Sequence, residues 1–162
     1  MNIQIRNLKI NKTFSEETLC FVASLYIDDN KVADVRNDGH GGSHYMHWIN
    51  GGLRAAFEVA AMERLGQDHP SIRESKYAQG LANDWLIDCL VGDCERRKLA
   101  ERLLKKIAWI HGNDVWAVKG VLDENMRHTV SQRYPGAVIL NDHTVDEVID
   151  MLRVIDNKGA AR

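Results

Sequence analysis

An α+β fold is predicted by three features of the amino-acid sequence. The first fifty residues alternate apolar and polar side chains with the period of two that is typical of strands. The middle of the chain instead repeats its apolar positions every three or four residues, as amphipathic helices do. The last third contains short apolar runs separated by helical patterns. Together they predict an N-terminal three-stranded antiparallel meander, central helices and a C-terminal β-α-β-α segment.

Three strands are predicted in the N-terminal part, at residues 2–10, 18–27 and 31–36. The apolar positions of the first strand change sides at Arg6–Asn7, which indicates a β-bulge. The second strand has the clearest alternation, with every other side chain apolar. Asp28-Asp29-Asn30 predicts a turn between the second and third strands. An antiparallel meander is the simplest arrangement of these elements.

Three helices are predicted in the middle of the chain, at residues 52–65, 79–90 and 94–110. Val91-Gly92-Asp93 is expected to separate the second helix from the third, because glycine weakens a helix and aspartate is a good N-cap. The third helix has the strongest amphipathic pattern, since charged residues cover the side opposite its apolar stripe. His111-Gly112-Asn113 is expected to end it.

The C-terminal part is predicted to contain a strand at 115–119, a helix at 123–134, a strand at 137–140 and a helix at 144–155. Two strands joined by a helix of this length can pair in parallel through a right-handed crossover. His143-Thr144 precedes acidic residues and predicts the start of the last helix.

Length and composition indicate one soluble domain over residues 1–162, with a polar tail at about 157–162 that is expected to fray. Lys and Arg number 21 against 23 Asp and Glu, so the overall charge favours neither a polyanion partner nor a polyanion mimic. No apolar run approaches the roughly 20 residues that cross a bilayer. The three cysteines fit reduced thiols in a cytoplasm. We therefore expect a cytoplasmic protein without membrane contact.

The first candidate site is a loop rich in glycine and histidine. Glycine adopts backbone conformations that other residues avoid, and Asn and Asp bond back to the main chain in turns. Such a loop forms either a structural corner or a binding loop, and the sequence leaves both interpretations open. The candidate binding residues are Asn37, Asp38, Gly39, His40, Gly41, Gly42, His44, Tyr45, His47 and Trp48.

A metal site is the catalytic alternative for this loop. His40, His44 and His47 could share a divalent ion such as zinc if the segment turns helically, with Asp38 or water as a further ligand. In a strand, His44 and His47 would point to opposite sides and the site would fail. The spacing matches no established zinc motif. We therefore expect no cofactor and assign no catalytic residue.

The second candidate site is the basic side of the predicted helix 94–110. Its cations could contact nucleic acid. Glu95 and Glu101 interleave with them, however, and Arg97, Glu101 and Lys105 have the i, i+4 spacing of a solvated ion-pair ladder. The residues of this basic face are Arg96, Arg97, Lys98, Arg102, Lys105 and Lys106.

Two segments resemble small accessory proteins encoded by bacteriophages and prophages. They are Lys31-Val-Ala-Asp-Val-Arg-Asn-Asp-Gly-His-Gly-Gly, which follows a similar meander, and Tyr134-Pro-Gly-Ala-Val-Ile-Leu-Asn141. The resemblance covers the first fifty residues and about twenty near the end. It implies a protein that binds and inhibits or modulates a host complex in the host cytoplasm, including antiviral defence systems of the anti-CRISPR kind. It carries over no catalytic residue.

Three functional hypotheses follow. The first is a non-enzymatic inhibitor whose partner is a host protein or ribonucleoprotein complex. The second is a metal-dependent hydrolase or nucleic-acid-processing enzyme that uses the three loop histidines. The third is a nucleic-acid-binding module that uses the basic helix, with an affinity that falls steeply with salt.

Overall fold

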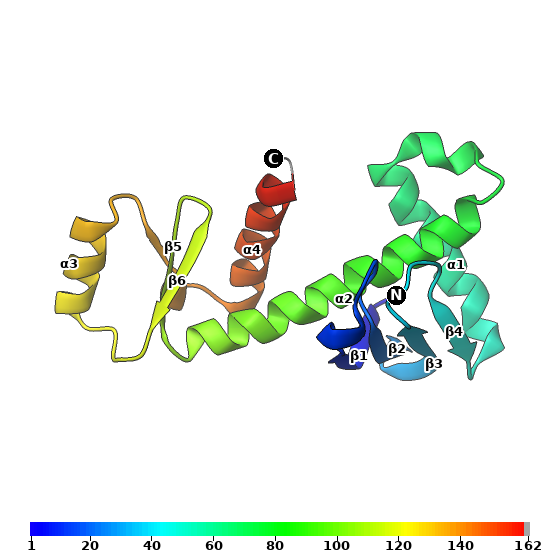
Figure 1. The fold of residues 1–162 in the computed structure, drawn as a ribbon, viewed down its shortest axis with the longest axis horizontal. Coiled ribbons are helices and arrows are strands. Elements are labelled where there is room, and N and C mark those ends of the chain that lie inside the picture. The colour runs from blue at the N-terminus through cyan, green and yellow to red at the C-terminus, as the bar shows by residue number, and fades with distance from the viewer. Residues whose placement is uncertain (161–162) are drawn as a thin grey trace. The chain divides into compact units, whose positions relative to one another are not determined.

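The computed structural model describes residues 1–160 and confirms the α+β fold (Figure 1). The chain divides into two compact units, Met1–Cys94 and Glu95–Arg162, each with its own core. The single domain expected over residues 1–162 stays a prediction. Residues 161 and 162, on which the expected frayed tail at 157–162 partly falls, lie outside the described residues. Over the part that is described, no helix combines the length and apolar character needed to cross a bilayer.

The first unit contains a four-stranded antiparallel sheet in the order β1-β2-β3-β4. Its strands are β1 (Ile3–Ile10), β2 (Phe21–Ile27), β3 (Asn30–Asn37) and β4 (Tyr45–Trp48), and the short 3-10 helix η1 (Lys12–Phe14) precedes β2. The sheet therefore has one strand more than the expected three-stranded meander. Residues of the predicted loop form β4, because Met46 and Trp48 turn toward the core while Tyr45 and His47 remain exposed.

Backbone geometry confirms two local predictions in this sheet. The register of β1 against β2 shifts between Arg6 and Lys9, where Asn7 has a positive φ of 57°. This irregularity is the β-bulge expected from the sequence. Asp28 and Asp29 have φ values of 46° and 66° and join β2 to β3 as a two-residue turn. Positive φ at both central residues is typical of the type I′ turn of tight hairpins.

Two helices cover one face of this sheet, which we call the inner face. Helix α1 (Gly51–Asp68) begins at Asn50, whose side chain accepts a hydrogen bond of 3.1 Å from the Gly52 N–H. The 3-10 helix η2 (Pro70–Glu74) leads to α2 (Ala78–Leu104). Their apolar sides and alternate residues of the strands form one core, in which the fully buried large side chains include Phe21, Leu25, Ile27, Phe57, Leu65, Leu86 and Ile87.

Helix α2 corrects two sequence expectations. It is a single helix of 27 residues, so Val91-Gly92-Asp93 does not separate two helices. Leu86, Leu90 and Cys94 continue one apolar stripe at four-residue spacing across that tripeptide, and their burial outweighs the roughly 1 kcal/mol that a helical glycine costs. The helix also ends at Leu104, so residues 105–110 are not helical as expected.

The second unit contains a three-stranded sheet in the order β6-β5-β7. Strands β5 (Ile107–His111) and β6 (Asp114–Val118) form a hairpin around Gly112-Asn113. The remaining elements are α3 (Glu124–Arg133), β7 (Val138–Ile139), the 3-10 helix η3 (Leu140–Asp142) and α4 (Val145–Ala160). The order of strands and α-helices after α2 is β-β-α-β-α, so the structure has one strand more than the expected β-α-β-α segment. The parallel pairing that the sequence allowed between the strands at 115–119 and 137–140 does not form, because β5 lies between β6 and β7 and pairs antiparallel with each.

The start of α4 matches its prediction. Thr144 and Glu147 form a capping box, in which the Thr144 N–H donates to Glu147 Oε2 at 2.7 Å and the Glu147 N–H donates to Thr144 Oγ1 at 3.3 Å. The Thr144 N–H, together with the Thr144 hydroxyl that donates to the same oxygen at 2.9 Å, holds the pKa of the Glu147 carboxyl below its usual value. The histidine-threonine pair at this position is therefore part of a helix start.

Candidate functional site

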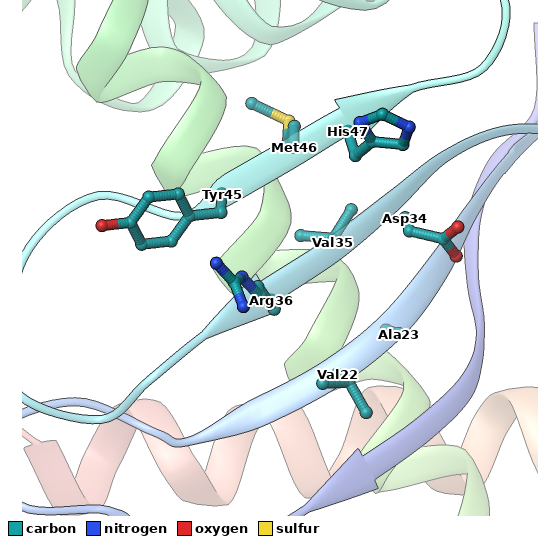
Figure 2. Close-up of a pocket in the computed structure, with 8 residues that line it drawn as sticks. All are labelled: Val22, Ala23, Asp34, Val35, Arg36, Tyr45, Met46 and His47. Atoms are coloured by element: carbon teal, nitrogen blue, oxygen red, sulfur yellow. The ribbon is translucent and has the colours of Figure 1, made fainter.

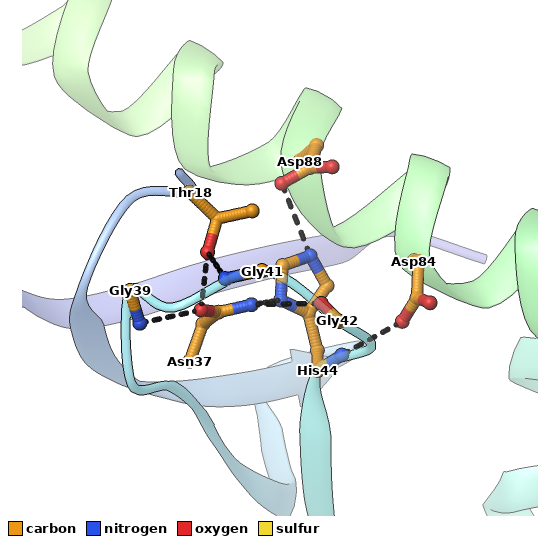
Figure 3. Close-up of polar contacts among 8 residues, drawn as sticks. All are labelled: Thr18, Asn37, Gly39, Gly41, Gly42, His44, Asp84 and Asp88. Atoms are coloured by element: carbon orange, nitrogen blue, oxygen red, sulfur yellow. Dashed lines mark hydrogen bonds and ion pairs between the residues drawn. The ribbon is translucent and has the colours of Figure 1, made fainter. Parts of the chain in front are cut away.

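The glycine-histidine loop is organised by the buried side chain of Asn37, the last residue of β3 (Figure 3). Its carboxamide oxygen accepts bonds of 2.8 Å from the Thr18 hydroxyl and from the Gly39 N–H. Its nitrogen donates to the Gly42 carbonyl at 3.3 Å and lies 3.0 Å from His44 Nδ1. A carboxamide has two donors and two acceptor lone pairs. All four are used within the protein, three by loop residues and one by Thr18.

Two glycines allow the chain to close around this side chain. Gly39 has a φ of +91°, and its carbonyl accepts bonds from the N–H groups of Glu16 and Glu17 at 3.0 Å. A Cβ on Gly39 would collide with the carbonyl oxygen of Phe14. Gly41 has a φ of +80°, and its N–H donates to the Thr18 hydroxyl at 3.2 Å. Glycine is needed at position 39 for both conformation and space.

His44 joins the loop to helix α2. Its side chain is only 5% exposed, its Nε2 lies 3.0 Å from Asp88 Oδ1, and its backbone N–H donates to Asp84 Oδ1 at 3.0 Å (Figure 3). One neutral tautomer satisfies the ring, because Nε2–H donates to Asp88 while Nδ1 accepts from Asn37. The ring also packs edge-on against Phe21. Both ring nitrogens are therefore engaged in holding the sheet to the helix.

The other two loop histidines lie elsewhere. His40 is exposed, and its Nδ1 lies 3.1 Å from Glu16 Oε2. His47 is on strand β4 opposite Asp34, so it follows the strand alternative in which His44 and His47 cannot share an ion. Among the side chains that the structure describes, no group of three His, Cys, Asp or Glu residues is placed to hold a metal. The geometry brings none of these three histidines together.

The remaining loop residues also differ in whether they are exposed or packed against the core. Asp38 is exposed, and its Oδ1 accepts a bond of 3.4 Å from the His40 N–H. Trp48 is half-buried and packs edge-on against Phe57 of α1, with ring centroids 5.5 Å apart. Tyr45 is 57% exposed. The predicted binding loop thus consists of two parts. Residues 37–44 form a segment held by internal hydrogen bonds, which we call the loop anchor, and the edge strand β4 follows it.

Strand β4 contributes to a larger surface, the sheet face opposite α1 and α2. Cross-strand register places Arg6, Ser24, Asp34 and His47 in one row across the four strands. A second row contains Lys9, Val22, Arg36 and Tyr45, and a third contains Gln4, Tyr26 and Lys31. Side chains alternate between the two faces of a strand, so these residues share one side. We call this surface, formed by these eleven residues, the outer face.

The outer face is cationic although the chain as a whole is not. It carries Arg6, Lys9, Lys31 and Arg36 against the single carboxylate of Asp34, whereas the formal net charge of the chain is −2. Asp29, in the adjoining turn, pairs with Arg6 and adds one further carboxylate. Counted with both aspartates of that turn, Asp28 and Asp29, the four cations still outnumber the carboxylates by one. The bond from Lys31 to Asp34, 2.7 Å long, holds the pKa of the Asp34 carboxyl below its usual value.

Two tyrosines on this face are stacked with arginines. The guanidinium of Arg6 lies 4.5 Å from the centre of the Tyr26 ring, and that of Arg36 lies 5.0 Å from the centre of the Tyr45 ring. Between the rows lies a hollow of about 500 Å³. Figure 2 shows the side chains of Val22, Asp34, Arg36, Tyr45 and His47 around it, on the side of the sheet away from α2.

Four residues of the predicted basic face, Arg96, Arg97, Lys98 and Arg102, lie on the end of α2 that belongs to the second unit, and Lys105 and Lys106 follow the helix. There Arg96 bonds to Asp156 at 2.9 Å and Arg97 bonds to Asp146 at 2.6 Å, both on α4. These ion pairs join two helices and offset two of the six charges. The others are Lys98, Arg102 and Lys105, which are exposed, and Lys106, which is half-buried.

Sequence reasoning missed two groups of residues. Thr18, Asp84 and Asp88 complete the loop anchor but are far from it in sequence, so no local pattern marks them. The outer-face cations and tyrosines were available as the polar half of the strand alternation. The alternation does not show which of them lie side by side, and only the register places them in rows.

Comparison with known proteins adds no relative. No protein-family profile, curated protein or solved structure matches the chain. Function therefore has to be inferred from the side chains and surfaces of this chain itself.

Proposed function

We propose that the chain is a phage-type accessory protein that binds a host complex without catalysing a reaction, and thereby inhibits or modulates it. The outer face is the binding surface in this proposal. The observation that carries it is the contrast between His40 and His44, which bond to Glu16 and to Asp88, and the outer face, which exposes cations, tyrosines and a hollow. The resemblance to phage accessory proteins supports a host complex as the target, with antiviral defence complexes as the target class.

The character of the outer face supports binding. Tyrosine and arginine are enriched among the residues that dominate binding energy in interfaces. Here Tyr45 is 57% exposed and Val22 is 51% exposed beside Arg36, so an apolar side chain and an aromatic ring lie next to a charge. Because α1 and α2 cover the inner face, the outer face is the side of this sheet that remains for a partner.

The metal-enzyme alternative gains no support from the geometry. Its central ligand, His44, has both ring nitrogens in hydrogen bonds within the protein, and His47 projects from the outer face. Elemental analysis of chain purified without chelator tests it directly. A stoichiometric transition metal that is lost together with His40, His44 and His47 would reverse this preference.

The proposal is tested with two charge-matched double variants. Lys9→Glu with Arg36→Glu reverses two exposed cations of the outer face. Arg64→Glu with Lys76→Glu makes the same charge change at exposed positions on α1 and after η2. The tagged full chain and both variants are expressed in bacterial host cells, and captured complexes are identified by mass spectrometry and assayed for activity.

The expected result is that the wild-type chain and the Arg64/Lys76 variant retain the same host complex and reduce its activity, whereas the Lys9/Arg36 variant does not. Equal capture by all three proteins would remove the outer face from the interface. Capture of a complex whose activity is unchanged would contradict inhibition or modulation.

A further inference from the structure

The outer face has the chemistry to bind a polyanion whose bases are unpaired. Its cations lie on two strands, Arg6 and Lys9 on β1 and Lys31 and Arg36 on β3, and Lys9 and Arg36 share one row across the sheet. Phosphate groups along a nucleic-acid backbone are recognised by such clusters, and the attraction is independent of sequence. A second copy of this chain is a poor occupant, because it would bring two cationic surfaces together.

Two stacking positions distinguish this surface from a simple basic patch. Bases stack on tyrosine rings and on guanidinium planes, and four-stranded sheets that present aromatic residues bind single-stranded RNA in this way. Here each position contains both groups, Arg6 with Tyr26 and Arg36 with Tyr45. A duplex exposes the faces of its bases only at its ends, so stacking favours a single strand.

The separation of the two stacks fits a chain of nucleotides rather than one base. Tyr26 and Tyr45 lie two strands apart, and their partners on β3, Lys31 and Arg36, lie five positions apart. With about 4.8 Å between strands and 3.3 Å per residue, the two rings are roughly 15–20 Å apart. The cationic row of Lys9 and Arg36 and the hollow at Val22 lie on the same face as both rings.

Asp34 favours ribose over deoxyribose. A carboxylate on a cationic surface repels phosphate but accepts a hydrogen bond from a hydroxyl group, and the 2′-hydroxyl is what distinguishes RNA. Among the described residues, Ser24 and Lys31 both bond to Asp34 Oδ1, at 3.2 and 2.7 Å. The second oxygen, Oδ2, therefore remains to accept from a ligand, and the side chain is 51% exposed at the hollow.

From this arrangement we infer that the outer face binds single-stranded RNA. Phosphates contact Lys9, Lys31 and the arginines, bases stack at the Arg6–Tyr26 and Arg36–Tyr45 positions, and a ribose hydroxyl donates to Asp34. The inference rests on the proposed function in taking the outer face as the binding surface, and it makes the partner of that face the RNA of a host ribonucleoprotein.

The test measures fluorescence anisotropy with labelled oligouridylate and with the deoxy oligomer of the same sequence, over a range of salt concentrations. The wild-type chain is expected to prefer RNA. For each phosphate contact, the logarithm of its binding constant is expected to fall by about 0.7 for every tenfold rise in salt concentration. The Lys9→Glu, Arg36→Glu variant is expected to flatten this slope by about 1.4, while the Arg64→Glu, Lys76→Glu control leaves it unchanged.

Two further variants separate stacking from charge. Tyr26→Ala and Tyr45→Ala each leave every cation in place and are expected to weaken binding about 5- to 150-fold. Asp34→Ala is expected to bring the RNA and DNA affinities together and to raise the DNA affinity, because a repelling carboxylate is removed. Circular dichroism spectra that match the wild type confirm that each variant is folded.

Three results would overturn the inference. They are no oligouridylate binding at low salt, equal affinity of the wild-type chain for both oligomers, and unchanged affinity after both tyrosine substitutions. Nuclease treatment of the captured host complex separates the two proposals. If capture survives nuclease but is lost in the Lys9/Arg36 variant, the outer face binds protein, so the proposed function stands and the RNA inference fails.

Discussion

The loop anchor and the outer face are neighbours in sequence but differ in how their polar groups are satisfied. Asn37 and His44 make all their side-chain hydrogen bonds within the protein. One residue later Tyr45 is 57% exposed, and Arg36 and Asp34 beside β4 are also exposed. The segment whose composition suggested a site uses its buried Asn37 and His44 side chains internally, whereas the exposed residues of the outer face belong to ordinary alternating strands.

This difference shows why residue types alone are a poor guide to a site. Glycine, asparagine and histidine are common in catalytic loops, but they are also what a tight turn needs when it must satisfy buried polar groups. A binding surface instead needs side chains that remain available after folding. The comparison predicts that substitutions in the anchor reduce stability, whereas substitutions on the outer face reduce binding and leave stability almost unchanged.

The largest effect is expected for Asn37→Ala. It removes four hydrogen bonds at a residue that is 3% exposed and leaves the Gly39 N–H and His44 Nδ1 without this partner. Each unsatisfied buried group costs about 1–3 kcal/mol, so we expect a loss of roughly 3–5 kcal/mol. Urea denaturation with an unchanged m-value measures it. Asp38→Ala, at the exposed neighbour, should change the free energy of unfolding by less than about 0.5 kcal/mol.

Gly39→Ala tests whether the loop conformation itself is required. A φ of +91° strains an alanine, and the added Cβ collides with the Phe14 carbonyl, so a loss of about 2–4 kcal/mol is expected. Gly42→Ala is the matched control, because φ is +107° but the added Cβ meets nothing within 4 Å. The difference between their free energies of unfolding isolates the collision. Equal values would mean that the anchor is not tightly packed at Gly39.

His44→Phe tests the connection from the loop to α2. Phenylalanine keeps a ring against Phe21 but loses the bonds to Asn37 and Asp88, so we expect a loss of about 1–3 kcal/mol. His40→Phe should cost less than about 0.5 kcal/mol, because its pairing with Glu16 is exposed. Thermal unfolding of both variants gives the comparison. If His40→Phe were the more damaging substitution, the anchor would be centred elsewhere in the loop.

Much of the fold could be predicted because its signals are local. Alternation gave the first three strands, the parity change at Arg6–Asn7 gave the bulge, and Asp28-Asp29 gave the turn. The failures came where tertiary burial outweighed local preference. Gly92 lies inside α2 because the apolar stripe of Leu86 and Leu90 continues past it.

Strands were missed for a related reason. Ile107–His111 was assigned to a helix, although Gly112-Asn113 between two apolar runs is also a two-residue hairpin turn. Tyr45–Trp48 is short, and its alternation was hidden by the histidine spacing. The candidate site could be predicted only in part, because the rows of the outer face depend on the register between strands. A one-residue shift of a strand would move all of its side chains to the other face.

The smallest effect is expected within the outer face itself. Because Lys31 lowers the pKa of Asp34, the Asp34 carboxylate contributes stability above the usual aspartate range, and this contribution is lost as pH falls through the lowered pKa. The pair is half exposed, so Lys31→Met should change the free energy of unfolding by less than about 0.5 kcal/mol. It should nevertheless raise the Asp34 pKa, measured by NMR titration of the carboxyl carbon, whereas Lys9→Met should not. A large loss of stability from Lys31→Met would show that the outer face, like the anchor, holds the fold together.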